Sequence, residues 1–327
     1  MSHSNISVFV PHAGCPNKCS FCDQHSISGA QFQPDAKFIR KVCSEALACS
    51  KDPDNTEIAF FGGSFTAIRR EYMIELLEAA YEFVGEGKFR GIRISTRPDY
   101  IDEDVLSILK SYGVTSIELG AQSLDDKVLE LNERGHSRED VVNASLLIKE
   151  HNFELGLQMM IGLYGSTIAS ETDTVNTILS IRPDTVRIYP VVILKNTKLS
   201  ELYKSGIFKP FEFDQVIDIA AEAITRFEDE GIRVIKVGLH ASEIVEQEML
   251  GGFYHPAFRE LCEARNYRNC IEKLFVGDEL TISVPAKDLS KAIGQKRSNI
   301  LYFAEKGKKL TVIPDKDQID YLKVINQ

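Results

Sequence analysis

The sequence predicts an α/β fold, in which six strand–helix repeats form one large unit and a smaller α/β unit follows. Short β-rich runs alternate with helical patterns over the first two-thirds of the 327 residues. The hydrophobic content of 43% is enough for a large core with a small one beside it. The net charge is -10, but residues 275–327 hold nine Lys and Arg against seven Asp and Glu, a net of +2, which leaves -12 for the remainder. The tail is therefore expected to be a separate electrostatic unit.

The six repeats follow one another without a low-complexity linker. Strands are predicted, in chain order, at 6–11, 56–61, 89–96, 114–120, 153–162 and 184–193, because these runs are rich in β-branched and aromatic residues. Helical periodicity follows each strand, at 35–50, 70–84, 102–112, up to about 150, at 170–181 and at 213–231. The second helix, for example, carries its apolar residues on one face, and Gly113 ends the third.

This alternation predicts right-handed βαβ units and a parallel sheet. Six repeats fit either a partial barrel or a doubly wound sheet, and the alternation alone does not choose between them. In a barrel, the chemistry would lie at the C-terminal ends of the strands. The motifs described below fall at those ends.

The chain is divided here into three predicted parts. Residues 1–240 form the large unit, and residues 241–274 form a connecting segment with a helical stretch at 257–267. Residues 275–327 form the small unit, in which a helical pair at 287–307 lies between two predicted strands, 279–285 and 308–314.

Cytoplasmic localisation is expected. No apolar run approaches the roughly 20 residues that span a bilayer, so no membrane partner is expected, and the N-terminus lacks a secretory signal. Seven cysteines, an odd number, argue against a disulfide framework. Cys43, Cys49, Cys262 and Cys270 are scattered and are interpreted as small apolar packing residues, with a further metal pair at 262 and 270 as the alternative.

The remaining cysteines form a compact motif. Cys15, Cys19 and Cys22 give C-x3-C-x2-C directly after the first predicted strand. Three thiolates can hold three corners of an iron–sulfur cubane, which leaves one iron open to a ligand, whereas most such clusters have four Cys ligands. The alternative is a zinc site with His12 or His25 as fourth ligand.

With Phe21 just before its last Cys, this motif resembles the signature of the radical S-adenosylmethionine (SAM) superfamily. The resemblance implies a (β/α)6 partial barrel and a [4Fe–4S] cluster held by the three cysteines. It also implies reductive cleavage of SAM to a 5′-deoxyadenosyl radical that abstracts hydrogen from a substrate, with an electron donor such as flavodoxin or ferredoxin. In such a site the cofactor supplies the reaction and the protein orients it.

Further motifs extend the resemblance over residues 6–240. FFGGSF at 60–65, with Gly62, Gly63 and Ser64, looks like the family's glycine motif at the SAM amino group. Gln122 and Arg134 have the family's twelve-residue spacing, which implies that Arg134 pairs with the SAM carboxylate. The resemblance also implies SAM contacts on the third and fifth strands, where this chain has Ser95 and Gln158.

Four nearby residues carry open interpretations. Met159 and Met160 either flank the adenine or pack in the core. His136 is either a polar group beside the cofactor or a structural histidine, and Tyr189 either packs at the barrel mouth or relays a radical.

Within the superfamily, the ordered motifs are similar to the radical SAM half of the Elongator catalytic subunit and to oxygen-independent coproporphyrinogen oxidase. Chemistry that uses acetyl-CoA is not expected, because no acetyl-CoA glycine loop is found and no acetyltransferase segment follows. Porphyrin chemistry is not expected either, since the two ends of the chain match poorly.

The tail resembles KH RNA-binding modules. In DLSKAIGQKRSNI (288–300), Gly294 opens a turn like the GxxG loop that clamps the nucleic-acid backbone, but Arg297 replaces the second Gly. Lys291, Lys296 and Arg297 offer phosphate contacts in compensation. The alternative is a small α/β cap with a solvated basic face.

The sequence thus predicts a radical SAM enzyme whose substrate is RNA, either tRNA or rRNA. A radical SAM enzyme acting on a small metabolite is the second hypothesis. The third is an RNA-binding protein in which the cluster is structural or senses redox state.

Overall fold

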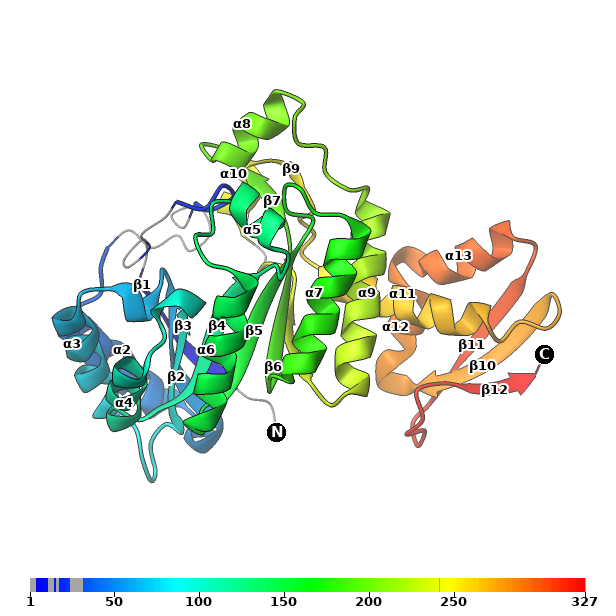
Figure 1. The fold of residues 1–327 in the computed structure, drawn as a ribbon. Helices are drawn as coiled ribbons and strands as arrows, with labels where there is room; N and C mark the ends of the chain where they lie inside the picture. The colour runs from blue at the N-terminus through cyan, green and yellow to red at the C-terminus, as the bar shows by residue number, and fades with distance from the viewer. Residues whose placement is uncertain (1–3, 11–14, 16–17, 24–31, 241, 327) are drawn as a thin grey trace.

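The computed structural model describes residues 4–10, 15, 18–23, 32–240 and 242–326. Seven strands form one parallel sheet in the order β1-β2-β3-β4-β5-β6-β8. Their bounds are β1 Ser4–Val10, β2 Thr56–Gly62, β3 Gly91–Thr96, β4 Val114–Gln122, β5 Glu154–Ile161, β6 Thr185–Pro190 and β8 Arg233–Val237. The sheet is curled into a half-barrel (Figure 1), as the partial-barrel prediction requires.

Helices cover the outer face of the curl and connect its strands (Figure 1). They are α2 Ala36–Cys49, α3 Arg70–Tyr81, α4 Glu103–Ser111, α5 Asp126–Leu131, α6 Arg138–Glu150, α7 Ile168–Ile181 and α9 Phe213–Asp229. Short segments gather at the C-terminal ends of the strands: β7 Val192–Leu194, α8 Lys198–Lys204, α10 Glu243–Glu248 and β9 Met249–Gly252. Because the strands are parallel, the loops that follow them meet at this one edge.

Two features of the sheet differ from the sequence prediction. Residues 233–237 form a seventh strand, β8, that was not predicted, because RVIKV is short and mixes charged with apolar residues. The run predicted as one strand at 184–193 divides after Pro190. Proline has no N–H to donate, which disfavours a continued ladder, and β7 pairs instead with β9.

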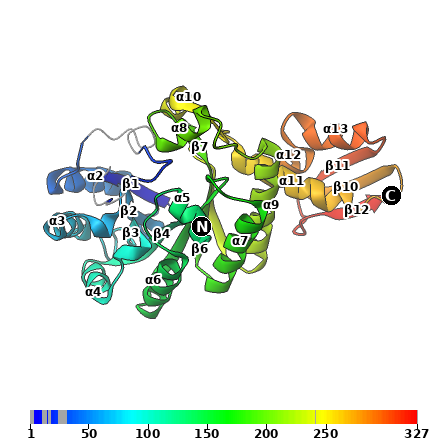
Figure 2. The same cartoon turned by 45° about the horizontal axis from the view of Figure 1, so that its top comes forward.

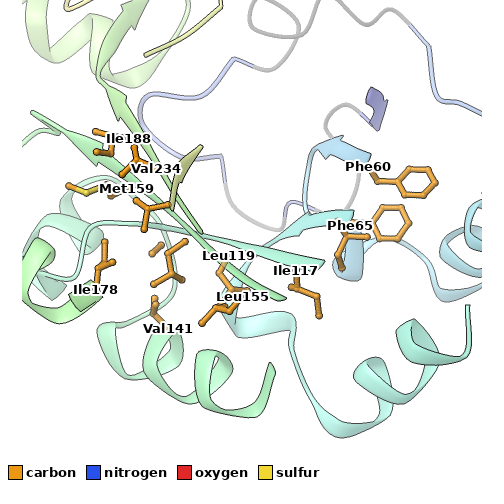
Figure 3. Packing of buried hydrophobic residues seen from close by; sticks show 14 of the residues in the cluster. Phe60, Phe65, Ile117, Leu119, Val141, Leu155, Met159, Ile178, Ile188 and Val234 are labelled. Atoms are coloured by element: carbon orange, nitrogen blue, oxygen red, sulfur yellow. The ribbon is translucent and has the colours of Figure 1, made fainter. Parts of the chain in front are cut away.

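The main core lies between the sheet and its outer helices (Figure 3). Ile117, Leu119 and Leu155 project from the strands toward Val141 of α6, and Phe60 stacks on Phe65 with ring centroids 4.6 Å apart. Alternate residues of each strand therefore face outward into this core, and the residues between them face the concave side.

The C-terminal unit has a core of its own. Its sheet pairs β10 Glu279–Pro285 in parallel with β11 Lys309–Asp315 and antiparallel with β12 Lys323–Asn326. The helices α12 Leu289–Ile293 and α13 Ser298–Glu305 lie between the two parallel strands in sequence. Figure 2 shows this unit beyond α9, with α11 Phe258–Glu272 leading into it.

The helix α11 joins the two cores. Phe258 and Cys262 belong to the main core, whereas Tyr267 and Ile271 belong to the C-terminal core. A division of the chain at residue 275 therefore stays a prediction, because the helix before it contributes to both sides. Among the described residues, no helix is long and apolar enough to cross a membrane.

Candidate functional site

The cysteine motif lies between β1 and α2 and is anchored from two sides. Ser20 donates its backbone N–H to Asn132 O at 3.1 Å and its hydroxyl to Asn132 Oδ1 at 2.8 Å. Leu199 N, in α8, donates to Ser20 O at 2.7 Å. The loop is therefore held between the segment after α5 and the start of α8. Sequence reasoning missed Ser20 and Asn132, because their pairing spans 112 positions.

The three cysteines differ in burial. Cys15 is exposed, Cys19 is buried and Cys22 is half-buried, while the side chain of Phe21 packs against the core. Burial raises the pKa of the Cys22 thiol to about 12, and the neighbouring Cys19 and Cys15 raise it further. A Cys22 thiol whose ionisation is disfavoured by burial and by its neighbours suits a positively charged iron centre, which would stabilise the thiolate.

The donor set fits an iron–sulfur cluster by its chemistry. Among the residues that the structure describes, no group of three or more His, Cys, Asp or Glu side chains is arranged so that it could hold a metal ion. The fit therefore rests on three thiols on one anchored loop. The alternative zinc ligands, His12 and His25, lie outside the described residues.

The glycine motif closes on the end of β1. Gly62 has φ +113°, and a Cβ there would lie 2.9 Å from Val10 O, so only glycine fits. Gly63 N donates to the same Val10 O at 3.0 Å. The backbone of Gly62 and Gly63 thus lies close against β1, the strand that leads into the cysteine loop.

A group of hydroxyls lies next to the glycines. Ser64 Oγ is 2.9 Å and Thr66 Oγ1 is 2.6 Å from Thr96 Oγ1, and Ser64 Oγ also accepts from Arg97 N at 3.2 Å. These side chains come from the ends of β2 and β3. Ser64 was predicted at the site, and Thr96 and Thr66 are additions from the structure.

Arg134 links the cysteine loop to β4. Its Nη1 donates to Cys19 Sγ at 3.1 Å and its Nη2 to Gly120 O at 2.5 Å. Its Nε is buried and has no partner among the described residues. Burying an N–H without a partner is costly, so this atom indicates a missing ligand.

Gln122 and Arg134, the two residues with the family's twelve-residue spacing, both lie beside Gly120. A Cβ built on Gly120 would lie 2.9 Å from Gln122 Nε2 and 3.4 Å from Arg134 Nη2. Gln122 ends β4 with φ +67°, a left-handed conformation that a side chain rarely adopts. Such strain is often found where a chain positions a ligand.

His136 adds a second buried atom without a partner. Its Nε2 lies 3.3 Å from Ala121 O, and its Nδ1 has no partner among the described residues. Burial, followed by the charges of Arg134 and Arg97, lowers the pKa of His136 to about 4. The ring is therefore neutral near pH 7, with Nε2 as donor and Nδ1 left as an acceptor.

The concave side of the sheet holds a buried ion network that sequence reasoning missed. Arg93 donates to Glu57 at 2.7 Å, to Glu118 at 3.1 Å and to Glu154 at 2.7 Å. Arg187 of β6 grips Glu118 through Nε at 2.7 Å and Nη2 at 2.8 Å. The sequence did contain a sign of this network, because several of the otherwise apolar strands each carry a charged residue.

Two predicted SAM contacts belong to this network. Gln158 Nε2 donates to Glu118 Oε2 at 2.9 Å and lies 3.3 Å from Ser95 Oγ. Ser95 and Gln158 therefore face the concave side together. Of the two methionines, Met159 is fully buried in the main core (Figure 3), whereas Met160 is half-buried.

Comparison with known protein families gives two successive matches along this chain. Residues 9–178 match the radical SAM superfamily, and residues 183–268 match the radical SAM C-terminal domain. The chain belongs to the radical SAM superfamily. It is therefore a radical SAM enzyme by family, and membership implies SAM and a [4Fe–4S] cluster as cofactors.

The curated relatives include tRNA uridine(34) acetyltransferases and Elongator complex proteins. A tRNA uridine(34) acetyltransferase of Methanocaldococcus infernus is 27% identical over 67% of this chain and 48% of its own length. Elongator complex protein 3 of Bos taurus is 30% identical over 65% of this chain and 42% of its own. The chain thus spans about half the length of these relatives.

Solved structures of the superfamily share the fold. The archaeal Methanocaldococcus infernus Elp3 has a TM-score of 0.63 at 24% identity, covering 84% of this chain and 64% of its own. The Escherichia coli coproporphyrinogen III oxidase has a TM-score of 0.51 at 19% identity, covering 70% and 52%. The predicted half-barrel and the resemblance to these two groups are confirmed.

In this radical SAM protein the predicted RNA-contact residues lie far along the chain, in the C-terminal unit. Gly294 has φ +79°, and Lys296 and Arg297 have φ +51° and +64°. Arg297, at the position of the second Gly of a GxxG loop, therefore has a left-handed conformation that glycine adopts more readily than other residues. Gln295, Lys296 and Arg297 are exposed, but Lys291 pairs with Asp288 at 3.0 Å and Glu263 at 3.2 Å.

Proposed function

We propose that this radical SAM enzyme binds its [4Fe–4S] cluster through Cys15, Cys19 and Cys22, binds SAM beside them, and modifies RNA. The observation that carries the cofactor proposal is Arg134. Its Nη1 contacts Cys19 Sγ at 3.1 Å, and its Nε is buried without a partner among the described residues. A guanidinium in this position suits a carboxylate bound next to the cluster.

The chain's own groups would then divide the work of holding SAM. When bound, the cluster and SAM supply reductive cleavage to a 5′-deoxyadenosyl radical. Arg134 would pair with the carboxylate, and Gln122 and the neutral His136 ring would offer a carboxamide and an acceptor nitrogen. Gly62 keeps the second strand tight against Val10. Phe21 packs inward from the loop and would shield it from water.

RNA is proposed as the substrate on two grounds. The curated relatives include tRNA-modifying enzymes by name. The turn at 294–297 carries the exposed Lys296 and Arg297 in strained left-handed conformations. The C-terminal unit around it has a strand, two helices and a second strand parallel to the first, an order that suits a KH-like module.

An aromatic residue with cations beside it, where α11 meets the C-terminal unit, also supports this proposal. The ring centroid of Tyr302 lies 4.4 Å from the guanidinium of Arg268 on α11 and 4.2 Å from the ammonium of Lys306, which also pairs with Glu272 at 2.6 Å. Aromatic and basic side chains interleaved in this way suit single-stranded nucleic acid. The relatives' acetyltransferase activity is not carried over, because the matched region covers about half of their length.

The reductant is proposed to be a flavodoxin- or ferredoxin-type protein. A thiolate-held cluster that must be reduced fits the reducing cytoplasm expected from the sequence. The exposed Cys15 supports electron entry from the loop side.

The test is anaerobic reconstitution with iron and sulfide, then addition of SAM, dithionite and, in separate reactions, total tRNA or rRNA. We expect 5′-deoxyadenosine to form, its rate to rise with tRNA, and one nucleoside of the digested tRNA to change mass. If 5′-deoxyadenosine forms but neither tRNA nor rRNA responds, the metabolite hypothesis replaces the RNA proposal. If a cluster assembles and SAM is not cleaved, the redox-sensor hypothesis does.

The RNA contact itself is tested by Arg297→Glu, with Lys316→Glu as a matched exposed control in the same unit. We expect Arg297→Glu to weaken tRNA binding and to reduce the slope of log K against log salt by about one. Equal binding by the two variants would remove the KH-like argument.

A further inference from the structure

The concave side of the half-barrel carries a positive cluster that the proposed SAM site does not use. Lys236 of β8 pairs in register with Arg187 of β6, so both side chains emerge on the same face of the sheet. That face is the concave one, because Arg187 binds Glu118 there and its guanidinium lies 5.2 Å from the ring centroid of Phe61, on β2. The contact between β6 and β2 shows that the curl brings opposite walls together.

Among the residues that the structure describes, no acid pairs with Lys236. Its side chain is half-buried, and its ammonium lies 3.0 Å from His240 Nδ1. Burial, followed by the positive charges of Arg187 and Arg259, lowers the pKa of Lys236. Arg187, by contrast, is compensated by Glu118. A half-buried ammonium surrounded by other cations is costly unless an anion joins it.

The cluster is held in place before any ligand arrives. Burial, and then Lys236 and Arg187, lower the pKa of His240, so its ring is neutral and accepts from the ammonium. The hydroxyl of Tyr254 donates to His240 O at 3.4 Å and accepts from Ser242 N at 2.9 Å, which holds the backbone at His240 and Ser242. Tyr189, two residues after Arg187 on β6 and on the same face, hydrogen-bonds Arg187. Pre-organised donors of this kind bind a ligand at a lower entropic cost.

We propose that Lys236, with Arg187 and His240, forms a subsite for a phosphate group of the substrate on the concave side of the sheet. The inference rests on the proposed function, since it assigns the phosphate to a nucleotide of the RNA. The subsite lies on β6 and β8, whereas the cysteine loop, the glycine motif and Arg134 follow β1, β2 and β4. The predicted SAM contacts Ser95 on β3 and Gln158 on β5 lie between the two, because Gln158 bonds the same Glu118 as Arg187. A phosphate held here would fix a nucleotide across the curl from the cofactor.

The experiment measures ligand binding to the full chain by ligand-observed NMR, with uridine 5′-monophosphate, uridine, inorganic phosphate and acetate as probes. The variants are Lys236→Gln, the conservative Lys236→Arg, and Lys41→Gln as control. Lys41 is an exposed lysine on α2, on the outer face. Circular dichroism confirms that each variant is folded.

We expect uridine 5′-monophosphate to bind about tenfold or more tightly than uridine, because a charge-assisted contact is among the stronger hydrogen bonds. Lys236→Gln should remove that difference, Lys236→Arg should keep most of it, and Lys41→Gln should keep all of it. Equal binding of nucleotide and nucleoside, or equal losses in Lys236→Gln and Lys41→Gln, would overturn the subsite. Acetate competing as well as inorganic phosphate would overturn the phosphate assignment in favour of a carboxylate.

The binding readout is independent of cofactor chemistry. If the wild-type chain binds the nucleotide at this subsite but does not cleave SAM, the proposed function fails and the subsite stands. If SAM is cleaved and the nucleotide shows no preference for its phosphate, the subsite fails and the proposed function stands.

Discussion

The two halves of the curled sheet present different chemistry on their functional edge. The half from β1 to β4 ends in thiols, glycines and hydroxyls, together with buried nitrogen atoms of Arg134 and His136 that have no partner among the described residues. The half from β5 to β8 carries the cations Arg187 and Lys236. The first half is suited to a cluster and a zwitterionic cofactor, and the second to an anionic substrate group.

Glu118 joins the two halves. It lies on β4, is 1% exposed, and accepts from Arg93 on one side and Arg187 on the other. Without it, two guanidinium groups would meet on the concave face. The comparison therefore predicts that the halves depend on this carboxylate for stability, but that each binds its own ligand.

The largest expected effect is at the cofactor half. Cys19→Ala should reduce iron and sulfide in the reconstituted protein to background, because two thiolates on the loop cannot hold the cubane. Iron analysis and visible absorption measure this, with Cys49→Ala as control, since Cys49 is exposed at the end of α2. An intact cubane spectrum in Cys19→Ala would refute the ligand assignment.

The next largest effect is expected at Glu118, which joins the two halves of the sheet. Glu118→Ala should lower the free energy of unfolding by about 3–5 kcal/mol, because it leaves buried guanidinium groups short of a partner. Urea denaturation of the full chain measures it. The control is Glu150→Ala, an exposed carboxylate on α6, for which a change within about 0.5 kcal/mol is expected. A loss for Glu118→Ala as small as for the control would mean that the halves are not coupled through this residue.

A smaller effect concerns the substrate half. Glu171 of α7 is 3% exposed and accepts from Gly162 N at 2.8 Å, just after β5. Burial raises the pKa of Glu171 from 4.5 to about 7. The folded chain thus binds this proton more tightly than the unfolded chain does. The protonated Glu171 therefore contributes fully to the free energy of unfolding below pH 4.5, and this contribution is lost as the pH rises through 7.

Between pH 5 and pH 8, the free energy of unfolding is expected to fall by about 2–3 kcal/mol through Glu171, since each unit of pKa shift corresponds to about 1.4 kcal/mol. Glu171→Gln keeps an oxygen acceptor for Gly162 N–H and cannot ionise, so its stability should lack this component. Urea denaturation at several pH values compares the two proteins. Identical pH profiles for both would show that Glu171 does not titrate in this range.

Most of the sheet follows from local pattern. The six predicted strands and their helices are found, because βαβ periodicity and turn residues are local signals. The seventh strand escaped, since five residues of RVIKV alternate too weakly to distinguish a strand from a loop. The division of the run at 184–193 could have been predicted only by giving more importance to Pro190. This residue has no N–H to continue the ladder, and the strand after it, β7, pairs with β9.

The candidate site was predictable where a motif carries it. The resemblance implied that Gln122 and Arg134 both reach SAM, which stays a prediction, and the structure brings both side chains beside Gly120. Partners set by tertiary packing were not predictable: Ser20 with Asn132, and Lys236 with its cationic neighbours, are decided by the curl of the sheet.

The most direct test of the account is 5′-deoxyadenosine formation by the reconstituted chain with SAM and dithionite. The wild type should form it, and Arg134→Gln should keep its cluster but fall by about tenfold or more, because the proposed carboxylate partner is lost. The control is Arg138→Gln, four residues on, whose guanidinium pairs with Asp173 at 2.7 Å instead. Full activity in Arg134→Gln, or an intact cluster without any SAM cleavage in the wild type, would contradict the account.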